Sequence, residues 1–429
     1  MRRIILQAKR HIHPFNEPAR DLRVQNKPLW LWQRDLLAPY TNEDREYVSL
    51  QAAQQNEGKQ AVEVIVHRDN LFFNDVLIRE FIGRGRAEEK PVRLAFRQDD
   101  PVIANHVQPL SGAFTKQGSL LLADIWYLPG GVSQSVDATP LVIDTEAQER
   151  GYYHVPPYMS AEFGDLIYQL PRKAFILIDS WVALFVADIL FGVFASGVVQ
   201  ENRINQDWRY KLRILYAALL EQRSVLSSRE LVQVGRNCNI DPSARIHGPT
   251  IIGNNVTIGA GAVIDNCIIG DNVTVSQGCQ LMLSVVGDGS FLPFRAALFM
   301  TTMMENSMVT QNTCLQLCVI GRDTFIGAGT TFTDFNLLPL PLKAMIGGRL
   351  HQTDFLVLGG CVGHHCRIGS GMIIYPGRTI ESDVVLVASA ERRVLTKNVR
   401  YADSDHFHYT HQVAYPRLYP PHAEGHDGE

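Results

Sequence analysis

Aliphatic residues recur at every sixth position through much of the second half of the chain. The first run has no miss: Val234, Ile240, Ile246, Ile252, Ile258 and Ile264. Three apolar columns then repeat every seventeen residues, starting at Ile269, Val275 and Leu281. The six-residue spacing returns at the end: Val362, Ile368, Ile374 and Ile380. Three columns with one period predict three short strands per coil, stacked as a left-handed parallel β-helix over about residues 234–394.

Small residues beside the apolar columns indicate how the backbone turns between strands. Glycine follows the apolar position at Gly235, Gly253 and Gly259. Glycine and asparagine accept the left-handed dihedrals that a tight corner needs. Each coil buries its apolar residues only by stacking on the next coil, so columns in register indicate one continuous prism with an aliphatic core.

The repeat is interrupted between Phe332 and Leu358. Residues 334–343 read D-F-N-L-L-P-L-P-L-K, with two prolines and an apolar tip. We expect a loop that leaves a corner of the prism, and long loops on rigid scaffolds often carry function. The alternative is a packing arm that grips a neighbouring subunit.

The chain before about residue 158 alternates strand-like and helix-like segments. Residues 62–66 predict a strand, Asp69 follows its carboxyl end, and residues 75–82 predict a helix. Strand followed by helix predicts an α/β layer, in which ligands bind outside the carboxyl ends of the strands. Asp69 is therefore a candidate for metal or substrate binding, with a helix cap or a solvated turn as the alternative.

A connector lies between these two parts. Residues 180–199 are almost wholly apolar and come close to the length of a membrane span. Because Asp188 interrupts the stretch and acids flank it, we expect a buried or interface helix, with membrane-surface association as the alternative. Residues 209–222 predict a second, amphipathic helix. The predicted domains are thus an α/β domain at 1–158, a helical connector at 159–232, a β-helix at 233–400 and a C-terminal tail at 401–429.

Composition and charge narrow the function classes. The chain has 429 residues, of which 46% are hydrophobic and 20% charged, as in globular proteins. A formal net charge of −4 gives no electrostatic case for a nucleic-acid partner. The apolar run at the start ends at Gln7, too early for a signal peptide. All seven cysteines lie at or after Cys238, and this odd number predicts reduced thiols in a cytoplasmic setting.

Cysteine pairs and tail histidines are the candidate metal ligands outside Asp69. The pairs are Cys314 with Cys318, and Cys361 with Cys366. These cysteines are either metal ligands or small residues of the prism core. The apolar positions beside them favour the core. In the tail, His406, His408 and His411 either chelate a metal ion or belong to a solvated segment.

Short segments in the first part, together with the order of the domains, carry a resemblance. Residues 26–29 (N-K-P-L) are similar to a G-K-P-L segment, residues 67–71 (H-R-D-N-L) to a G-D-N-hydrophobic segment, and residues 123–127 (A-D-I-W-Y) to an N-A-G-I-Y strand. With the connector and the prism, they resemble the bifunctional N-acetylglucosamine-1-phosphate uridyltransferase family and related sugar-1-phosphate nucleotidyltransferases. The resemblance implies that Asp69 holds a catalytic magnesium ion and that Lys27 meets the substrate.

The phosphate-binding loop of that family is altered in this chain. The family begins L-A-A-G-x-G-x-R, a loop whose backbone N–H groups hold the nucleotide phosphates. Residues 6–10 read L-Q-A-K-R and lack both glycines, so side chains block close backbone approach to a phosphate. We predict no nucleotidyl transfer at an ordinary rate, although Lys9, Arg10 and Arg23 still meet a phosphate by charge.

The prism carries its own resemblance to that family. Residues 326–330 (I-G-A-G-T) are similar to the segment before its acetyl-CoA loop, but Asp334 and Phe335 replace its Asn-Tyr pair, and no histidine stands near Gln311, where its basic histidine lies. Hexapeptide-repeat acyltransferases, which this prism resembles, use a histidine as general base. The candidates here are His351, His364 and His365, with Lys343 as the contact for a phosphate of acyl-CoA.

Two functions remain open on the sequence. One is a transferase, acyl or remnant nucleotidyl, that acts on a sugar phosphate or sugar nucleotide with acyl-CoA or magnesium. The other is a non-catalytic sugar-nucleotide-binding or assembly scaffold. A zinc hydratase, also known on such prisms, requires His247, His351 and His364 to converge on a metal. The resemblance further implies a homotrimer whose prisms pair side by side, with residues 335–342 as an apolar contact.

Overall fold

The chain divides into two compact units. The computed structural model describes residues 1–57, 62–110, 114–153, 166–222, 224–336, 342–346, 349–353, 355–409 and 415–421. Unit 1 comprises Met1–Arg10 and Pro18–Asp179, and unit 2 comprises His11–Glu17 and Ser180–Glu429. The apolar connector therefore belongs with the prism, and so does a short segment from near the start of the chain.

Unit 1 is built on a seven-stranded sheet in which β1 lies between β6 and β7, parallel to both. The path of the sheet is β12-β9-β11-β7-β1-β6, with β10 paired to β11. Only β11 breaks the common direction, since it pairs antiparallel with β7, β9 and β10. The strands are β1 (Arg2–Leu6), β6 (Glu43–Tyr47), β7 (Val64–Arg68), β9 (Val92–Arg97), β10 (Thr115–Gln117), β11 (Leu120–Leu128) and β12 (Thr139–Val142).

Helices and short hairpins complete unit 1, so the predicted α/β layer is confirmed. The predicted helix at 75–82 is α3 (Asp75–Glu88), which begins where the Asn74 side chain accepts the N–H of Leu77. The other helices are α1 (Leu29–Leu37) and α2 (Leu50–Glu57). Two antiparallel strand pairs lie outside the main sheet: β13 (Ala147–Tyr153) with β14 (Leu166–Pro171), and β8 (Leu71–Phe73) with the distant β15 (Phe175–Leu177).

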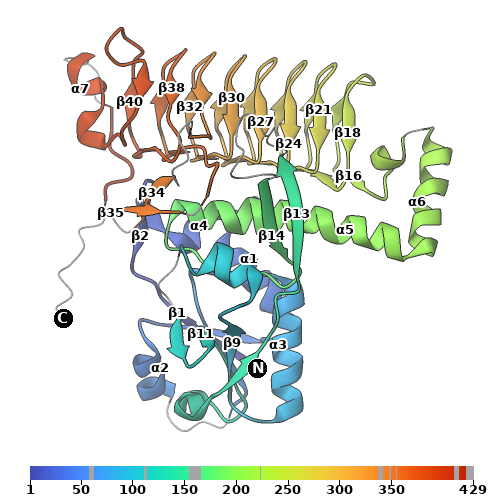
Figure 1. The fold of residues 1–429 in the computed structure, drawn as a ribbon, viewed down its shortest axis with the longest axis vertical. Helices are drawn as coiled ribbons and strands as arrows, with labels where there is room; N and C mark the ends of the chain where they lie inside the picture. Colours follow the sequence, from blue (N-terminus) through green and yellow to red (C-terminus); the bar gives the residue numbers. More distant parts are fainter. Residues whose placement is uncertain are drawn as a thin grey trace. The chain divides into compact units, whose positions relative to one another are not determined.

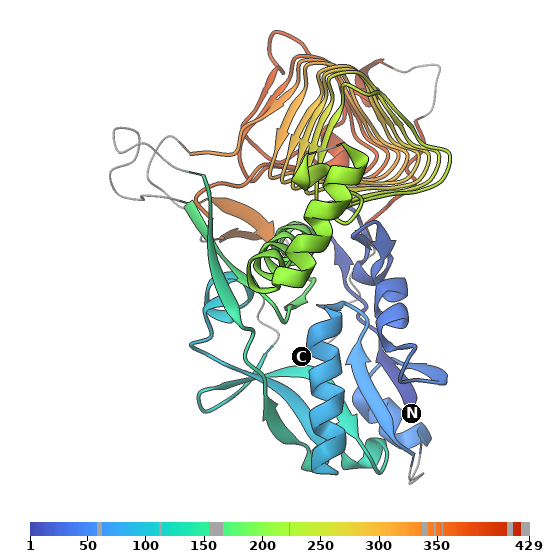
Figure 2. The ribbon, with the colours of Figure 1, turned by 90° about the vertical axis from the view of Figure 1, so that its right-hand side faces the viewer.

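Unit 2 holds the prism, which consists of three parallel sheets of eight strands each (Figures 1 and 2). The first sheet contains β16 (Val232–Val234), β19 (Thr250–Ile252), β22 (Ile268–Ile269), β25 (Val285–Val286), β28 (Thr302–Met303), β31 (Val319–Ile320), β36 (Cys361–Val362) and β39 (Thr379–Ile380). The second contains β17 (Asn239–Ile240), β20 (Thr257–Ile258), β23 (Thr274–Val275), β26 (Phe291–Leu292), β29 (Met308–Val309), β32 (Phe325–Ile326), β37 (Arg367–Ile368) and β40 (Val385–Leu386).

The third sheet completes the triangle and confirms the three predicted columns. Its strands are β18 (Arg245–His247), β21 (Val263–Asp265), β24 (Gln280–Met282), β27 (Ala297–Phe299), β30 (Cys314–Gln316), β33 (Thr331–Phe332), β38 (Ile373–Ile374) and β41 (Val394–Leu395). The columns that start at Ile269, Val275 and Leu281 fall on the first, second and third sheet, and all three side chains are buried in one core. The seventeen-residue period thus correctly predicted which side chains face the interior of the prism.

Asparagines at the corners stack on one another. Asn237, Asn255 and Asn272 adopt positive φ values of 57°, 57° and 58°. The amide of Asn237 donates to Asn255 at 3.3 Å, and that of Asn255 donates to Asn272 at 3.1 Å. Asparagine tolerates this left-handed conformation, and the ladder ties successive coils together.

The long apolar connector packs on the first sheet. It is one helical stretch, Trp181–Gln206, made of α4 (Trp181–Phe185), η4 (Val186–Phe194) and α5 (Ala195–Gln206). By length and composition it is long enough to cross a membrane, but 78% of its apolar window is buried in the structure. Asp188 has no exposed surface and accepts the Thr302 hydroxyl of β28 at 2.5 Å. The helix is therefore the buried element that the interrupting acid predicted.

The predicted excursion from the prism is a hairpin. β34 (Lys343–Ile346) pairs antiparallel with β35 (Arg349–Gln352), and the coil resumes when β31 pairs with β36. The apolar tip, including Leu337, Leu338 and Leu340, lies outside the described residues, as does His411 of the tail. The second predicted helix of the connector is α6 (Trp208–Glu221), and the described part of the tail contains α7 (His406–Tyr409).

Candidate functional site

The first candidate site is the carboxyl edge of β1, β6 and β7 in unit 1. Asp69 follows β7 directly, and its N–H donates to the Leu6 carbonyl at the end of β1. The chain passes from β1 to β6 on one side and then returns to β7 on the other side. In open α/β sheets such a reversal of strand order opens a crevice where ligands bind. Asp69 thus lies where the sequence placed it.

Four side chains form the edge cluster: Gln7, Arg20, Glu46 and Asp69. Asp69 is 2% exposed, and its Oδ1 accepts the Ala8 N–H at 2.8 Å. Its Oδ2 lies 3.5 Å from Nη1 of Arg20. Arg20 in turn donates two hydrogen bonds of 3.0 Å to Glu46, which also accepts the Gln7 amide at 2.9 Å. Burial raises the pKa of the Asp69 carboxyl above its ordinary value.

This arrangement does not fit the predicted magnesium ion. Magnesium needs oxygen ligands in octahedral geometry, mostly carboxylates and waters. One Asp69 oxygen is occupied by a backbone N–H and the other faces a guanidinium, which supplies the positive charge in place of a metal. Among the described residues, no group of three or more His, Cys, Asp or Glu side chains is placed to hold a metal ion. No chemical step through magnesium follows from this site.

The two predicted substrate contacts of unit 1, Lys27 and Arg23, bond to residues other than Asp69. Lys27, at the start of β5 (Lys27–Pro28), is exposed and pairs with Asp35 at 3.0 Å. Arg23, in β4 (Arg23–Val24), donates to the Asn26 carbonyl at 2.8 Å. Their roles in substrate binding stay predictions.

The second candidate site is the coil that carries His364 and His365. His364 has no exposed surface, and its ring lies between Phe15 and Tyr419 with centroid distances of 5.0 and 4.8 Å. Its Nδ1 accepts the Arg322 N–H at 2.9 Å, so Nε2 carries the proton and donates to Glu17 at 3.1 Å. Burial lowers the pKa of His364. Both nitrogens are engaged, and the contacts support a structural role.

His364 belongs to a buried ionic group that we call the cap network: Glu17, Glu305, Arg322 and His364. Arg322 donates to both oxygens of Glu17, at 2.8 and 2.7 Å, and its Nε lies 3.1 Å from Glu305. Burial alone raises the pKa of Glu17, but hydrogen bonds from His364 and Arg322 hold it below its ordinary value. The sequence analysis missed Glu17, Glu305 and Arg322, since residues 305 positions apart carry no pattern that links them.

His365 is held just outside this network. Its Nδ1 lies 2.9 Å from Oδ1 of Asp383, which is fully buried. The ring stacks on Tyr415 at 4.6 Å with an interplanar angle of 4°, and the Tyr415 hydroxyl donates to the His365 carbonyl. The catalytic roles of His364 and His365 stay predictions.

The hairpin places the remaining candidates in solvent. His351 pairs with Ala344, and Lys343 pairs with Gln352, so the alternation of side chains sets His351 and Lys343 on opposite faces. Both side chains are exposed. His351 is therefore the predicted general base that an external substrate reaches most easily.

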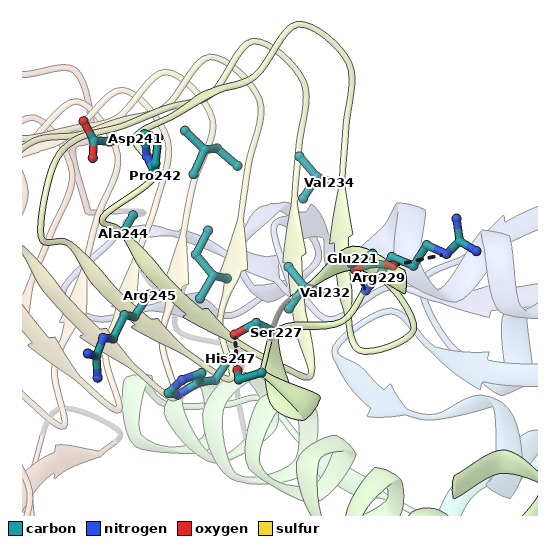
Figure 3. A pocket seen from close by; sticks show the side chains of 13 residues that line it. Glu221, Ser227, Arg229, Val232, Val234, Asp241, Pro242, Ala244, Arg245 and His247 are labelled. Atoms are coloured by element: carbon teal, nitrogen blue, oxygen red, sulfur yellow. Dashed lines mark hydrogen bonds and ion pairs between the residues drawn. The ribbon is translucent and has the colours of Figure 1, made fainter. Parts of the chain in front are cut away.

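A cavity of about 950 Å³ lies at the first coil of the prism (Figure 3). Apolar residues such as Val232, Ile240 and Ile246 form part of its lining. The charged groups beside them already have partners: Arg229 lies 3.3 Å from Glu221, and His247 lies 3.4 Å from Asp265. The cavity marks the open end of the core and contains no described nucleophile paired with a base.

The cysteines are free thiols without a metal cluster among the described residues. Five are buried: Cys267, Cys279, Cys318, Cys361 and Cys366. Burial raises the pKa of Cys267 to about 12, so its thiol stays protonated. These cysteines act as small core residues.

Comparison with known proteins supports the resemblance in the prism. Residues 228–297 match the family model described as the GMPPB C-terminal domain, a sugar-nucleotidyltransferase family with a hexapeptide β-helix. This confirms the resemblance for the first coils, and the chain joins them to an N-terminal α/β domain. A search of curated proteins finds no match to the chain.

Two of the solved structures that this chain is similar to are named as acetyltransferases. A mutant GDP-perosamine N-acetyltransferase from Caulobacter crescentus, in complex with CoA and GDP-perosamine, has 15% identity, covers 36% of this chain and 54% of its own, and gives a TM-score of 0.14. The acetyltransferase domain of PglB from Neisseria gonorrhoeae, also solved with acetyl coenzyme A, has 16% identity, covers 42% and 63%, and gives 0.15. This chain spans about half the length of the first, and TM-scores this low carry no argument about activity.

Proposed function

We propose that this chain is a non-catalytic scaffold that binds a sugar phosphate or sugar nucleotide. The observation that carries the proposal is the edge cluster, where the backbone N–H of Ala8 and the guanidinium of Arg20 engage the carboxylate of Asp69. In addition, residues 6–10 lack the two glycines of a phosphate loop, and Arg20 occupies the edge beside Asp69. Nucleotidyl transfer depends on a metal and on that loop, and the pairing of Asp69 with Ala8 and Arg20 therefore supports binding without transfer.

Two exposed cations support retained binding. Lys9 and Arg10 follow β1 at the same sheet edge as Asp69, and both are exposed. A phosphate is recognised by charge-assisted hydrogen bonds from such groups. We therefore assign the anionic part of the ligand to Lys9 and Arg10, with Asp69 acting to fix the backbone at Ala8.

The test is calorimetric titration with sugar 1-phosphates and nucleotide sugars, in magnesium and in EDTA. The affinity should be equal in magnesium and in EDTA. The double variant Lys9→Ala, Arg10→Ala should bind at least about tenfold more weakly, which corresponds to about 1.4 kcal/mol. The control is Arg79→Ala, which removes an exposed arginine paired with Asp75 on α3. Release of pyrophosphate from a nucleoside triphosphate, abolished by Asp69→Asn, contradicts the proposal and restores the transferase.

Acyl transfer is the second candidate, favoured by the exposure of His351 on β35. A histidine general base contributes roughly 10²–10⁴ in rate when it reaches the acceptor. Acyl-CoA binding that is lost with Lys343→Ala, together with turnover lost with His351→Ala, would support it. Absence of acyl-CoA binding to the intact chain would remove it. The homotrimer and a cytoplasmic location accompany both candidates as predictions, and the free cysteines are in keeping with a reducing compartment.

A further inference from the structure

Helix α6 carries an apolar stripe that faces solvent. The stripe consists of Trp208, Leu212, Leu215, Tyr216 and Leu219, which are 65%, 53%, 42%, 64% and 76% exposed. The opposite side of the same helix is already used, since Tyr210 and Ile214 pack with Leu231 in a small buried cluster. α6 therefore has two apolar sides, and its own chain covers one of them.

Exposed apolar surface is concentrated in this region. Of the 25 large hydrophobic residues that are exposed in the described part of the chain, nine lie between residues 208 and 234: the five of the α6 stripe with Leu220, Val225, Leu226 and Val234. Figure 1 shows α6 beyond β16 and β18, at the end of the prism where the first coil lies. Contiguous apolar patches of this kind mark interaction sites on soluble proteins.

The spacing of the α6 stripe indicates a second helix as the partner. Trp208, Leu212, Leu215 and Leu219 follow the 4-3-4 spacing of a coiled-coil seam. α6 is well defined at both ends, because the Asp207 side chain accepts the N–H groups of Arg209 and Tyr210, and Gln222 ends the helix in a left-handed conformation. In the described part of the chain no other helix exposes such a seam, since the remaining exposed helical hydrophobics are isolated.

We propose that α6 docks against α6 of a second copy of this chain, in an antiparallel pair. The amino-terminal half of α6 carries exposed cations, Arg209 and Lys211, on the two flanks of the stripe. A parallel pair brings like charges together. An antiparallel pair sets each cationic half beside the negatively polarised carboxyl end of the partner helix. This arrangement has twofold symmetry, so one self-complementary surface serves both copies.

The test measures mass by analytical ultracentrifugation of the full chain from about 1 to about 200 μM, because a single helix pair buries less than a standard interface. We expect the wild-type mass to be twice that of the double variant Leu212→Glu, Leu219→Glu. The matched control is Leu350→Glu, a leucine 51% exposed on β35, which should keep the wild-type mass. Circular dichroism and thermal unfolding check that each variant is folded.

A second experiment tests the direction of the helices. Trp208→Cys and Leu219→Cys, mixed and oxidised, should form a disulfide that neither variant forms alone, with wild type as the background for the native cysteines. A disulfide in Trp208→Cys alone overturns the antiparallel pair. Equal masses of the wild type and the double variant overturn the helix pairing. Co-sedimentation of a monomeric wild type with phosphatidylserine vesicles, lost in the double variant, overturns it in favour of a membrane surface.

Discussion

The two ends of the prism are closed in different ways. At the end that carries the last coils, segment His11–Glu17 and the segment around Tyr419 lie against the coil of His364, and Ser382 donates to the Pro14 carbonyl at 3.0 Å. At the first coil, an apolar cavity remains and part of the core reaches solvent. The later coils are therefore covered at one corner by polar contacts from distant segments, while the first coil presents apolar surface.

This difference shows that a β-helix needs a solution for each end separately. At the last coil, Ser404 and Asp405 cover the backbone of β40, since the Val385 N–H donates to the Ser404 hydroxyl and the Asp405 N–H donates to the Val385 carbonyl, both at 2.8 Å. The cap network adds charge pairing along one corner of the later coils, because Glu305, Arg322 and His364 follow β28, β31 and β36. Buried ion pairs contribute little net stability but become costly when one member is lost. The sealed end should thus be sensitive to single changes, and the open end should tolerate them.

The largest expected effect is at the cap network. Arg322→Met leaves Glu17 and Glu305 as partly buried carboxylates without their shared cation, and we expect a loss of about 2–3 kcal/mol in the free energy of unfolding. The matched change near the open end is Arg213→Met, which breaks the exposed pair with Glu230 and should cost less than about 1 kcal/mol. Urea denaturation measures both. Equal losses would contradict the contrast between the ends.

A core substitution sharpens the same contrast. Ile380→Ala removes a 1% exposed side chain under the closed end, and we expect a loss of about 2–5 kcal/mol from the cavity. Ile240→Ala, in the first coil, should cost about 1 kcal/mol, because part of that side chain already faces solvent. Chemical denaturation of both variants, with hydrogen exchange as a local readout, checks the ranking. A larger loss for Ile240→Ala would reverse it.

The closed end should also be sensitive to acid. Burial lowers the pKa of His364, so below about pH 6.5 the unfolded histidine binds a proton while the folded one stays neutral, and stability falls. Glu17 acts in the same direction at lower pH, because its folded pKa is depressed and its contribution is lost as pH falls through that value. His364→Asn should flatten the slope of stability against pH between 6.5 and 5, by up to about 1.4 kcal/mol per unit.

Buried histidines of unit 1 also reduce stability in acid, so their contribution must be distinguished from that of His364. Burial lowers the pKa of His67 to about 3 and that of His106 to about 4, so both stay neutral in the folded state at moderate acidity. The comparison is therefore wild type against His364→Asn at each pH, which leaves the unit 1 histidines unchanged. An identical slope in the two proteins would assign the effect to titratable groups other than His364, such as His67, His106 and His13.

The smallest expected effect lies on α6. Leu219→Ser changes a side chain that is 76% exposed and should shift stability of the dilute chain by less than about 0.5 kcal/mol. Ile214→Ser, on the covered side of the same helix, should cost more than about 2 kcal/mol. Thermal unfolding at low concentration makes the comparison. Similar losses for the two would mean that both sides of α6 are covered in solution.

The sequence predicted the elements whose pattern is local. A period of seventeen residues placed Ile269, Val275 and Leu281 on three sheets, because stacking requires the same spacing in every coil. Asp188 correctly indicated that the apolar connector is a buried helix. The amphipathic pattern also predicted α6, although it did not show that the helix has a second apolar side.

The candidate site was less accessible from the sequence. Asp69 was placed at the correct edge of the sheet, but its pairing with Ala8 and Arg20 depends on chain paths that no spacing encodes. His364 stood out as a histidine at a corner of the prism. Its partner Glu17 comes from the other end of the chain, and residues so far apart are joined only by the fold.

The contact between Glu17 and His364 has a consequence for how the protein is made. These residues are 347 positions apart, and a ribosome adds about 5–20 residues per second. Segment His11–Glu17 therefore leaves the ribosome roughly 20–70 s before the coil that receives it. During that interval its carboxylate and aromatic side chains have no binding site in the nascent chain. Unit 2 is thus completed only late in synthesis, and chaperones that shield nascent chains have the longest opportunity to bind at this early segment.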